Sequence, residues 1–420
     1  MKEERFCEFR RRKRKRQRKA KGKSFFKRPR EPKIKSFFEE QRKRIGRRRF
    51  EDQRVEEVNE CQPFSEIPSA LLCEILGRLP IKACLTCKLV CKEWYHVVIG
   101  PEFSSFRRHR TSSRFSILLY DSSGADVGHN FNLIELEKRF DFNVKGKRFV
   151  GVADFFRFKQ KIDRSSKIWH LKSHCNGVVC FARGKVDFFV CHLLAGQCVK
   201  LQNLDQVRNL SLYIPRCQLG CCPVSGQFKV LLLFWDAKMK IQLAKIQTLG
   251  DGEWRSVGYA PLKIMMDGCL LNGSSHWPDH SYIWSFDFGK EEFSQISLPN
   301  DVNNGSHKKA NRNLSAFNSC LCLSCSPRDS SRGEIDIWVM QEYGVKESWV
   351  KQFVIVGGSW SVPVMQLDKG MILVRTGDNL YVYDPQTKLS DAVEFQQNGA
   401  LSCGDNVVLS VGFDVSFSRF

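Results

Sequence analysis

The chain has 420 residues, enough for two or three domains and at least one sizeable core. Its 67 Lys and Arg residues outnumber 45 Asp and Glu residues, which gives a formal net charge of +22. Residues 1–54 hold 25 basic and 8 acidic residues, a net +17, which leaves +5 for the other 366 positions. We therefore expect a basic tail before a nearly neutral folded part, which argues against a nucleic-acid-binding domain with a basic surface stripe.

Neither a membrane span nor a secreted disulfide framework is expected. The longest apolar run, Val230–Trp235, falls far short of the roughly 18 residues that a spanning helix requires. The 18 cysteines could form disulfides, but the first residues contain no apolar signal segment that would direct the chain to an oxidising compartment. We expect a soluble, intracellular protein with reduced thiols and no membrane partner.

The first 60 residues are predicted to be a disordered basic tail, because the like charges of Arg10–Lys23 and later clusters repel one another. A nuclear import signal is the favoured interpretation and predicts a nuclear or nucleo-cytoplasmic protein. A solvated tail without a role, a nucleic-acid anchor using Phe25-Phe26 and Phe37-Phe38 for stacking, and an over-extended gene model remain alternatives.

Residues 63–103 are predicted to form three short helices. The first carries apolar residues at helical spacing after Pro68 and ends at Pro80, and the second starts near Ile81. The third is expected around Trp94 and stops before Gly100. About forty residues cannot bury so much apolar surface in one small bundle, so we expect part of it to face a partner.

This segment resembles the F-box motif in residue order, spacing and type, from Ile67-Pro68 to Pro101-Glu102-Phe103. The resemblance implies a three-helix module, at residues 61–106, that docks on the Skp-family adaptor of cullin-based ubiquitin ligases. The residues expected to share adaptor binding and core packing are Ile67, Pro68, Leu71, Ile75, Leu79, Pro80, Leu85, Val90, Cys91 and Trp94.

Cysteines in this segment raise the question of a metal site. Cys84, Cys87 and Cys91 follow one helical face, and Cys84-x-x-Cys87 imitates half of a zinc site. A second ligand pair does not follow nearby, and a buried free cysteine packs as a small hydrophobe. We expect no metal here or at Cys320-x-Cys322-x-x-Cys325, and no cofactor.

From residue 107 to 413 the apolar period changes from 3.6 to 2, as in "SYIWSFDFG", and the strands return through turns such as "TLGDGEWRSV". Turn residues at Gly196, Gly250, Gly289, Gly344 and Pro385 are separated by 54, 39, 55 and 41 residues. A period in the forties with several strands predicts an antiparallel β-propeller of about six blades, with a β-sandwich pair as the alternative. Residues 414–420 form the C-terminal end.

The same region resembles the F-box-associated domain of plant F-box proteins. The segments that carry the resemblance are "SHCNGVVCF", "FKVLLLF", "LNGSSHW", "IWSFDFGKEEFSQISLP" and "IWVMQEYGVKESWVKQF". The resemblance implies a multidomain α+β protein of plant origin that serves as a substrate receptor.

The tripeptide His174-Cys175-Asn176 contains the residue types of a cysteine-protease triad. Consecutive strand residues point to opposite faces, so these three cannot converge, and Asn176-Gly177 is interpreted as a tight turn. No other catalytic motif is present in the sequence. We therefore expect a noncatalytic protein.

The predicted function is that of a substrate-recognition subunit of a Skp–cullin–F-box ubiquitin ligase. The F-box would bind the adaptor, and through it the cullin, while the β domain recruits an unknown protein target. The alternative is a nuclear nucleic-acid-binding protein that uses the basic tail. Exposed candidates for the target site are the turns at 276–280 and 300–313, the second interpreted as a mobile loop.

Overall fold

The computed structural model describes residues 67–110, 114–121, 130–137, 149–150, 154–159, 169–183, 187–195, 197–202, 215–236, 238–261, 268–303, 310–326, 333–356, 360–377, 379–394 and 407–411. The predicted tail, 1–60, and C-terminal end, 414–420, lie outside these residues. The domain boundaries stay predictions. No helix in the described ranges is both long and apolar enough to cross a membrane.

The helical module, residues 67–110, contains four described helices where three were predicted. They are α3 (Ser69–Gly77), α4 (Ile81–Cys87), α5 (Lys92–Ile99) and α6 (Pro101–Arg110). The sequence prediction ended the third helix correctly before Gly100 but missed α6. Pro101 suits a first helical position, and Phe103 and Arg107, one turn apart, are both buried.

The helices pack on the β domain through one shared core. Buried Leu72, Leu76 and Val98 from the helices join Leu118 of β1 (Arg114–Asp121) and Leu133 of β2 (Asn130–Glu137) in a single cluster. Helix α3 lies close to α6, since a Cβ added at Gly77 would be 2.9 Å from the Phe106 ring. The helical module and the first strands therefore bury their apolar faces against each other.

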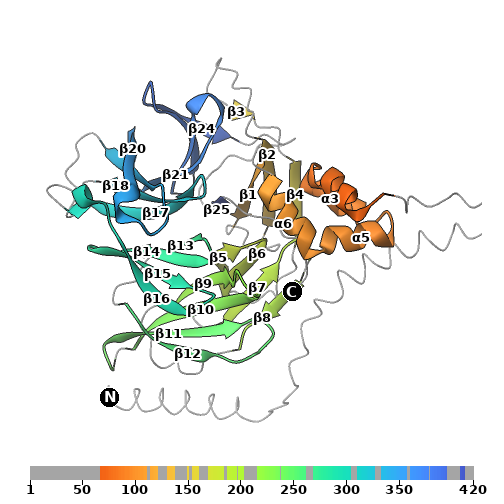
Figure 1. Cartoon of the computed structure of the whole chain (residues 1–420), viewed down its shortest axis with the longest axis horizontal. Helices are drawn as coiled ribbons and strands as arrows, with labels where there is room; N and C mark the ends of the chain where they lie inside the picture. The colour runs from red at the N-terminus through yellow and green to blue at the C-terminus, as the bar shows by residue number, and fades with distance from the viewer. Residues whose placement is uncertain are drawn as a thin grey trace, which may run out of the picture. The chain divides into compact units, whose positions relative to one another are not determined.

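The described strands form six sheets, numbered here in chain order (Figure 1). The first contains β25 (Val407–Val411), β1, β2 and β4 (Asp154–Lys159), and the second β5 (Trp169–Cys175), β6 (Val178–Arg183), β7 (Asp187–His192) and β8 (Gln197–Lys200). The third contains β9 (Arg216–Cys221), β10 (Phe228–Asp236), β11 (Ile241–Thr248) and β12 (Arg255–Ala260). The fourth contains β13 (Cys269–Leu271), β14 (Ser274–Pro278), β15 (Tyr282–Asp287) and β16 (Glu292–Ser297).

The fifth sheet contains β17 (Asn311–Phe317), β18 (Cys320–Ser326), β19 (Glu334–Met340) and β20 (Trp349–Val356). The sixth contains β21 (Ser361–Gln366), β22 (Ile372–Thr376), β23 (Asn379–Asp384), β24 (Leu389–Glu394) and the short parallel strand β3 (Phe149–Val150). Apart from β3, neighbouring strands within these sheets are antiparallel.

Successive sheets begin at residues 169, 216, 269, 311 and 361, so they are 47, 53, 42 and 50 residues apart. The first strands of neighbouring sheets contact one another, β5 with β9, β13 with β17 and β17 with β21. Strand β25 joins the first sheet by pairing with β1, which brings the two ends of the β domain together. The predicted helical module followed by an antiparallel β-propeller is confirmed, and the sandwich alternative does not fit six consecutive sheets.

The hairpin turns also agree with the sequence prediction. Asn176 and Gly177 have φ of 46° and 80°, and this left-handed pair connects β5 to β6. Such φ values match those of the primed turns that suit the twist of antiparallel strands.

The 300–313 segment is different from the predicted loop, because Asn300–Asn303 form a 3₁₀ turn and β17 begins at Asn311. Residues 304–309 lie outside the described ranges.

Candidate functional site

Helix α3 carries apolar side chains in two neighbouring stripes, one residue apart in the sequence. Leu72 and Leu76 are 4% and 1% exposed and point into the shared core, whereas Leu71 and Ile75 are 52% and 51% exposed. Residues four apart lie on the same face of a helix, so each pair forms a short stripe. The sequence alone shows one apolar helix, and packing assigns one stripe to the core and leaves the other at the surface.

A second group of exposed apolar side chains follows α4. Leu89 and Val90 are 73% and 61% exposed, in a turn where their amides donate to the carbonyls of Thr86 and Cys87 at 2.9 and 3.1 Å. Exposed Cys91 then caps α5, since its Sγ accepts from the Trp94 amide at 3.5 Å. We refer to Leu71, Ile75, Leu89 and Val90 as the exposed apolar group.

The structure divides the ten residues predicted to bind the adaptor into two classes. Those at the surface are Pro68, Leu71, Ile75, Val90 and Cys91. Those half-buried are Ile67, Leu79, Leu85 and Trp94, which pack against the shared core, and Pro80. The adaptor role of each stays a prediction.

Leu89 is exposed but was not among the ten. In the sequence it falls four residues after Leu85, at the spacing of a continuing helix. Helix α4 ends at Cys87, so the period is broken and Leu89 turns outward. The sequence signal for this exposed site was the pair of consecutive apolar residues, Leu89 and Val90, just before the Cys91 cap.

The corner between α3 and α4 is held by side chains from distant parts of the chain. Glu135 of β2 accepts from the Ile81 amide at 2.7 Å and from Arg107 Nη2 at 2.5 Å. Arg107 Nη1 donates to the Leu79 carbonyl at 2.6 Å and to Cys84 Sγ at 3.3 Å. The Arg107 and Glu135 side chains are only 5% and 7% exposed, so the ion pair lies in the core.

The cysteines of the helical module behave as packing residues. Burial raises the pKa of the Cys84 thiol to about 11, so the thiol stays protonated and Sγ can donate to the Leu76 carbonyl at 3.2 Å. Across the described ranges, no group of three or more His, Cys, Asp or Glu side chains is placed to hold a metal ion.

One cysteine pair corrects the expectation that all thiols are reduced. Cys191 of β7 and Cys198 of β8 are direct partners in the antiparallel register and form a disulfide. Cross-strand partners hold their Cβ atoms within bonding reach, a proximity that residue spacing did not reveal.

His174, Cys175 and Asn176 do not form a catalytic triad with one another. Cys175 is buried in the core between the second and third sheets, and Asn176 belongs to the turn already described. His174 and Cys175 occupy successive strand positions and so project to opposite faces. The interpretation of Asn176-Gly177 as a turn is confirmed.

The predicted target turn at 276–280 is only partly at the surface. His276 and Trp277 are 0% and 1% exposed, Pro278 and Asp279 are half-buried, and His280 is exposed. Buried Arg312 of β17 donates to the carbonyls of Asp279 and His280 at 2.8 and 2.6 Å, which fixes the turn from the neighbouring sheet. A search for the two-residue period of a β-strand in this segment would have predicted a strand, and not a turn, at His276 and Trp277.

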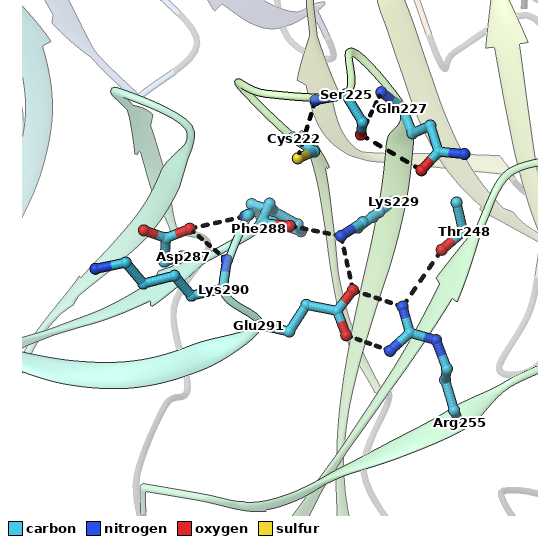
Figure 2. Close-up of polar contacts among 11 residues, drawn as sticks. Cys222, Ser225, Gln227, Lys229, Thr248, Arg255, Asp287, Phe288, Lys290 and Glu291 are labelled. Atoms are coloured by element: carbon cyan, nitrogen blue, oxygen red, sulfur yellow. Dashed lines mark hydrogen bonds and ion pairs between the residues drawn. The ribbon is translucent and has the colours of Figure 1, made fainter.

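A charged cluster joins the third and fourth sheets (Figure 2). Glu291, in the turn between β15 and β16, binds Lys229 Nζ at 2.7 Å and both terminal nitrogens of Arg255. These hydrogen bonds lower the pKa of Glu291 to about 2, and the hydrogen bonding from Arg255 has the largest effect. Lys229 also donates to the Phe288 carbonyl at 2.8 Å, so the buried ammonium has two acceptors. The cluster connects two sheets and has no feature of a ligand site.

The cavity between β20 and the sixth sheet has a volume of about 270 Å³. Its walls are aliphatic, tyrosine and small hydroxyl side chains, including Ser361 and Thr376, whose oxygens lie 2.7 Å apart. Ligand pockets commonly span about 300–1,000 Å³. This cavity falls below that range and does not indicate a cofactor.

Comparison with known proteins gives two family matches. Residues 64–106 match the F-box domain, and residues 154–403 match the F-box associated beta propeller domain. F-box protein At3g07870 of Arabidopsis thaliana is 25% identical over 332 residues, which cover 69% of this chain and 72% of that protein. F-box protein CPR1 of Arabidopsis thaliana is 23% identical over 325 residues, covering 69% and 73%. The F-box/kelch-repeat protein At3g23880 from the same plant is 23% identical over 346 residues, covering 75% and 87%.

Proposed function

Because this chain belongs to the plant F-box proteins with an F-box-associated β-propeller domain, we propose that it is the target-binding subunit of a Skp–cullin–F-box ubiquitin ligase. The helical module binds the Skp-family adaptor, and through it the cullin scaffold. The β domain recruits a protein target, which is unknown. Ubiquitin chemistry belongs to the other subunits, and this chain contributes binding.

The exposed apolar group of the helical module is the observation that supports this proposal. Four large aliphatic side chains within 20 residues are each more than half exposed. Fully burying an exposed aliphatic side chain contributes on the order of 1.5–3 kcal/mol, and each of these four still has at least half of its surface to bury. Exposed apolar side chains that gather into a patch are typical of sites that bind another protein.

Adaptor capture tests the proposal directly. We expect the full chain to bind a recombinant Skp-family adaptor and Leu71→Asp/Ile75→Asp to lose at least about 100-fold in affinity, because two charges replace apolar anchors at the interface. Leu389→Asp is the matched control, since this leucine is 68% exposed in β24 of the propeller. Absence of capture by the folded wild-type chain, or equal binding by the double variant, would contradict the docking role.

A ubiquitin-transfer assay separates a receptor from an enzyme. With activating and conjugating enzymes and ubiquitin but no adaptor or cullin, we expect the chain to form no ubiquitin thioester. A reductant-sensitive ubiquitin adduct on this chain would identify a catalytic cysteine and refute the receptor role.

For the basic tail we propose nuclear import, supported by the concentration of positive charge in residues 10–23. A fluorescent protein fused to residues 1–60 should accumulate in nuclei, and replacing the Lys and Arg residues of this segment by Gln should abolish accumulation. The same distribution for both fusions would contradict import. Salt-sensitive RNA binding that disappears on deletion of residues 1–54 would support the nucleic-acid alternative.

A further inference from the structure

The α3–α4 corner lacks a cap of its own. Pro80 precedes α4 and its ring has no acceptor, so the first free amide of the helix, at Ile81, needs a partner from elsewhere. Glu135 supplies that partner from β2, 54 residues further along the chain, at 2.7 Å. A carboxylate at a helix N-terminus is also favoured by the helix dipole.

The carbonyl side of the same corner depends on a second distant residue. Arg107 of α6 donates to the Leu79 carbonyl at 2.6 Å and pairs with Glu135. Leu79 and Pro80 are among the residues predicted to bind the adaptor. The Leu79 carbonyl is one of the two contacted groups, and Pro80 lies between it and the Ile81 amide. Glu135 and Arg107 therefore add two contacts from distant parts of the chain to the local hydrogen bonds that position the backbone of the corner.

We infer that Glu135 and Arg107 are positioning residues for adaptor binding, so that the first propeller sheet is part of the docking apparatus. This inference rests on the proposed function. Removing the Glu135 carboxylate leaves the Arg107 guanidinium buried beside a neutral group, and the corner then loses its fixed geometry. Binding of the adaptor must restore that geometry. The free energy needed to restore it is subtracted from the binding free energy, so the measured affinity falls.

Calorimetric titration of the adaptor into the full chain tests the inference. We expect Glu135→Gln and Arg107→Lys to bind at least about tenfold more weakly, within the usual range for coupled sites. Glu291→Gln is the matched control, because it removes another carboxylate with two cationic partners, between the third and fourth sheets. Its affinity for the adaptor should equal that of the wild type.

Hydrogen exchange on the wild-type chain tests the inference without requiring that any variant folds. Coupling is reciprocal, so adaptor binding should slow exchange of the backbone amides that pair β1 with β2, and leave β14–β15 unchanged. Two results would overturn the inference and leave the receptor function standing. One is unchanged exchange of the β1–β2 amides on adaptor binding. The other is a wild-type chain that binds the adaptor and a Glu135→Gln variant whose affinity is within twofold of it. Failure of the wild type to bind overturns the receptor function itself.

Discussion

His276 shows at the residue scale how burial decides chemistry. Its side chain is fully buried in β14, with Nδ1 at 3.1 Å from the Cys269 carbonyl and Nε2 at 2.7 Å from the Tyr343 hydroxyl. A carbonyl only accepts, so Nδ1 carries the proton and Tyr343 donates to Nε2. The imidazole is neutral because burial lowers its pKa from 6.5 to about 4.

This depressed pKa predicts a loss of stability in mild acid. The unfolded chain takes up a proton at His276 below about pH 6.5 and the folded chain only near pH 4, so stability present at pH 7 falls between these values. At pH 5 we expect a contribution of about 2 kcal/mol to be lost. Urea unfolding of wild type and His276→Gln at pH 7, 6 and 5 measures it. Parallel pH profiles for the two proteins would contradict the assignment.

At the scale of the element, α3 presents a matched comparison between its two faces. Leu76→Ala should reduce the free energy of unfolding by about 2–5 kcal/mol, because it leaves a cavity in the core shared with the β domain. Leu71→Ala removes an exposed side chain and should change it by less than about 0.5 kcal/mol. Chemical denaturation checks both, and similar losses would mean that Leu71 is buried in solution.

Elements whose signals are local were predictable from the sequence. Pro68 and Pro80 mark the starts of α3 and α4, and Asn176-Gly177 marks a tight turn, because each residue type constrains its own backbone. Helix α6 was missed, and the turn at 276–280 was misplaced, because burial against other elements stabilises them. Arg107 in particular looks like a surface residue until Glu135 is beside it.

At the scale of the whole molecule, β25 closes the β domain by pairing with β1 from Ile117↔Val411 to Asp121↔Val407. A chain that ends at residue 403 should leave the edge of β1 unpaired, and we expect its midpoint of thermal unfolding to fall by on the order of 5 °C. Truncation after Val411 keeps β25 and is the control. Identical midpoints for the two truncations would show that this pairing adds no stability.

The sequence by itself determined the two-part architecture and the family, because helical period, strand alternation and motif spacing are properties of neighbouring residues. Tertiary structure decided which of two apolar stripes of α3 is buried, which cysteines meet across β7 and β8, and how Glu135 and Arg107 hold the α3–α4 corner. These outcomes depend on contacts between residues far apart in the chain. A local pattern shows that a side chain is apolar or charged, and only packing determines what it meets.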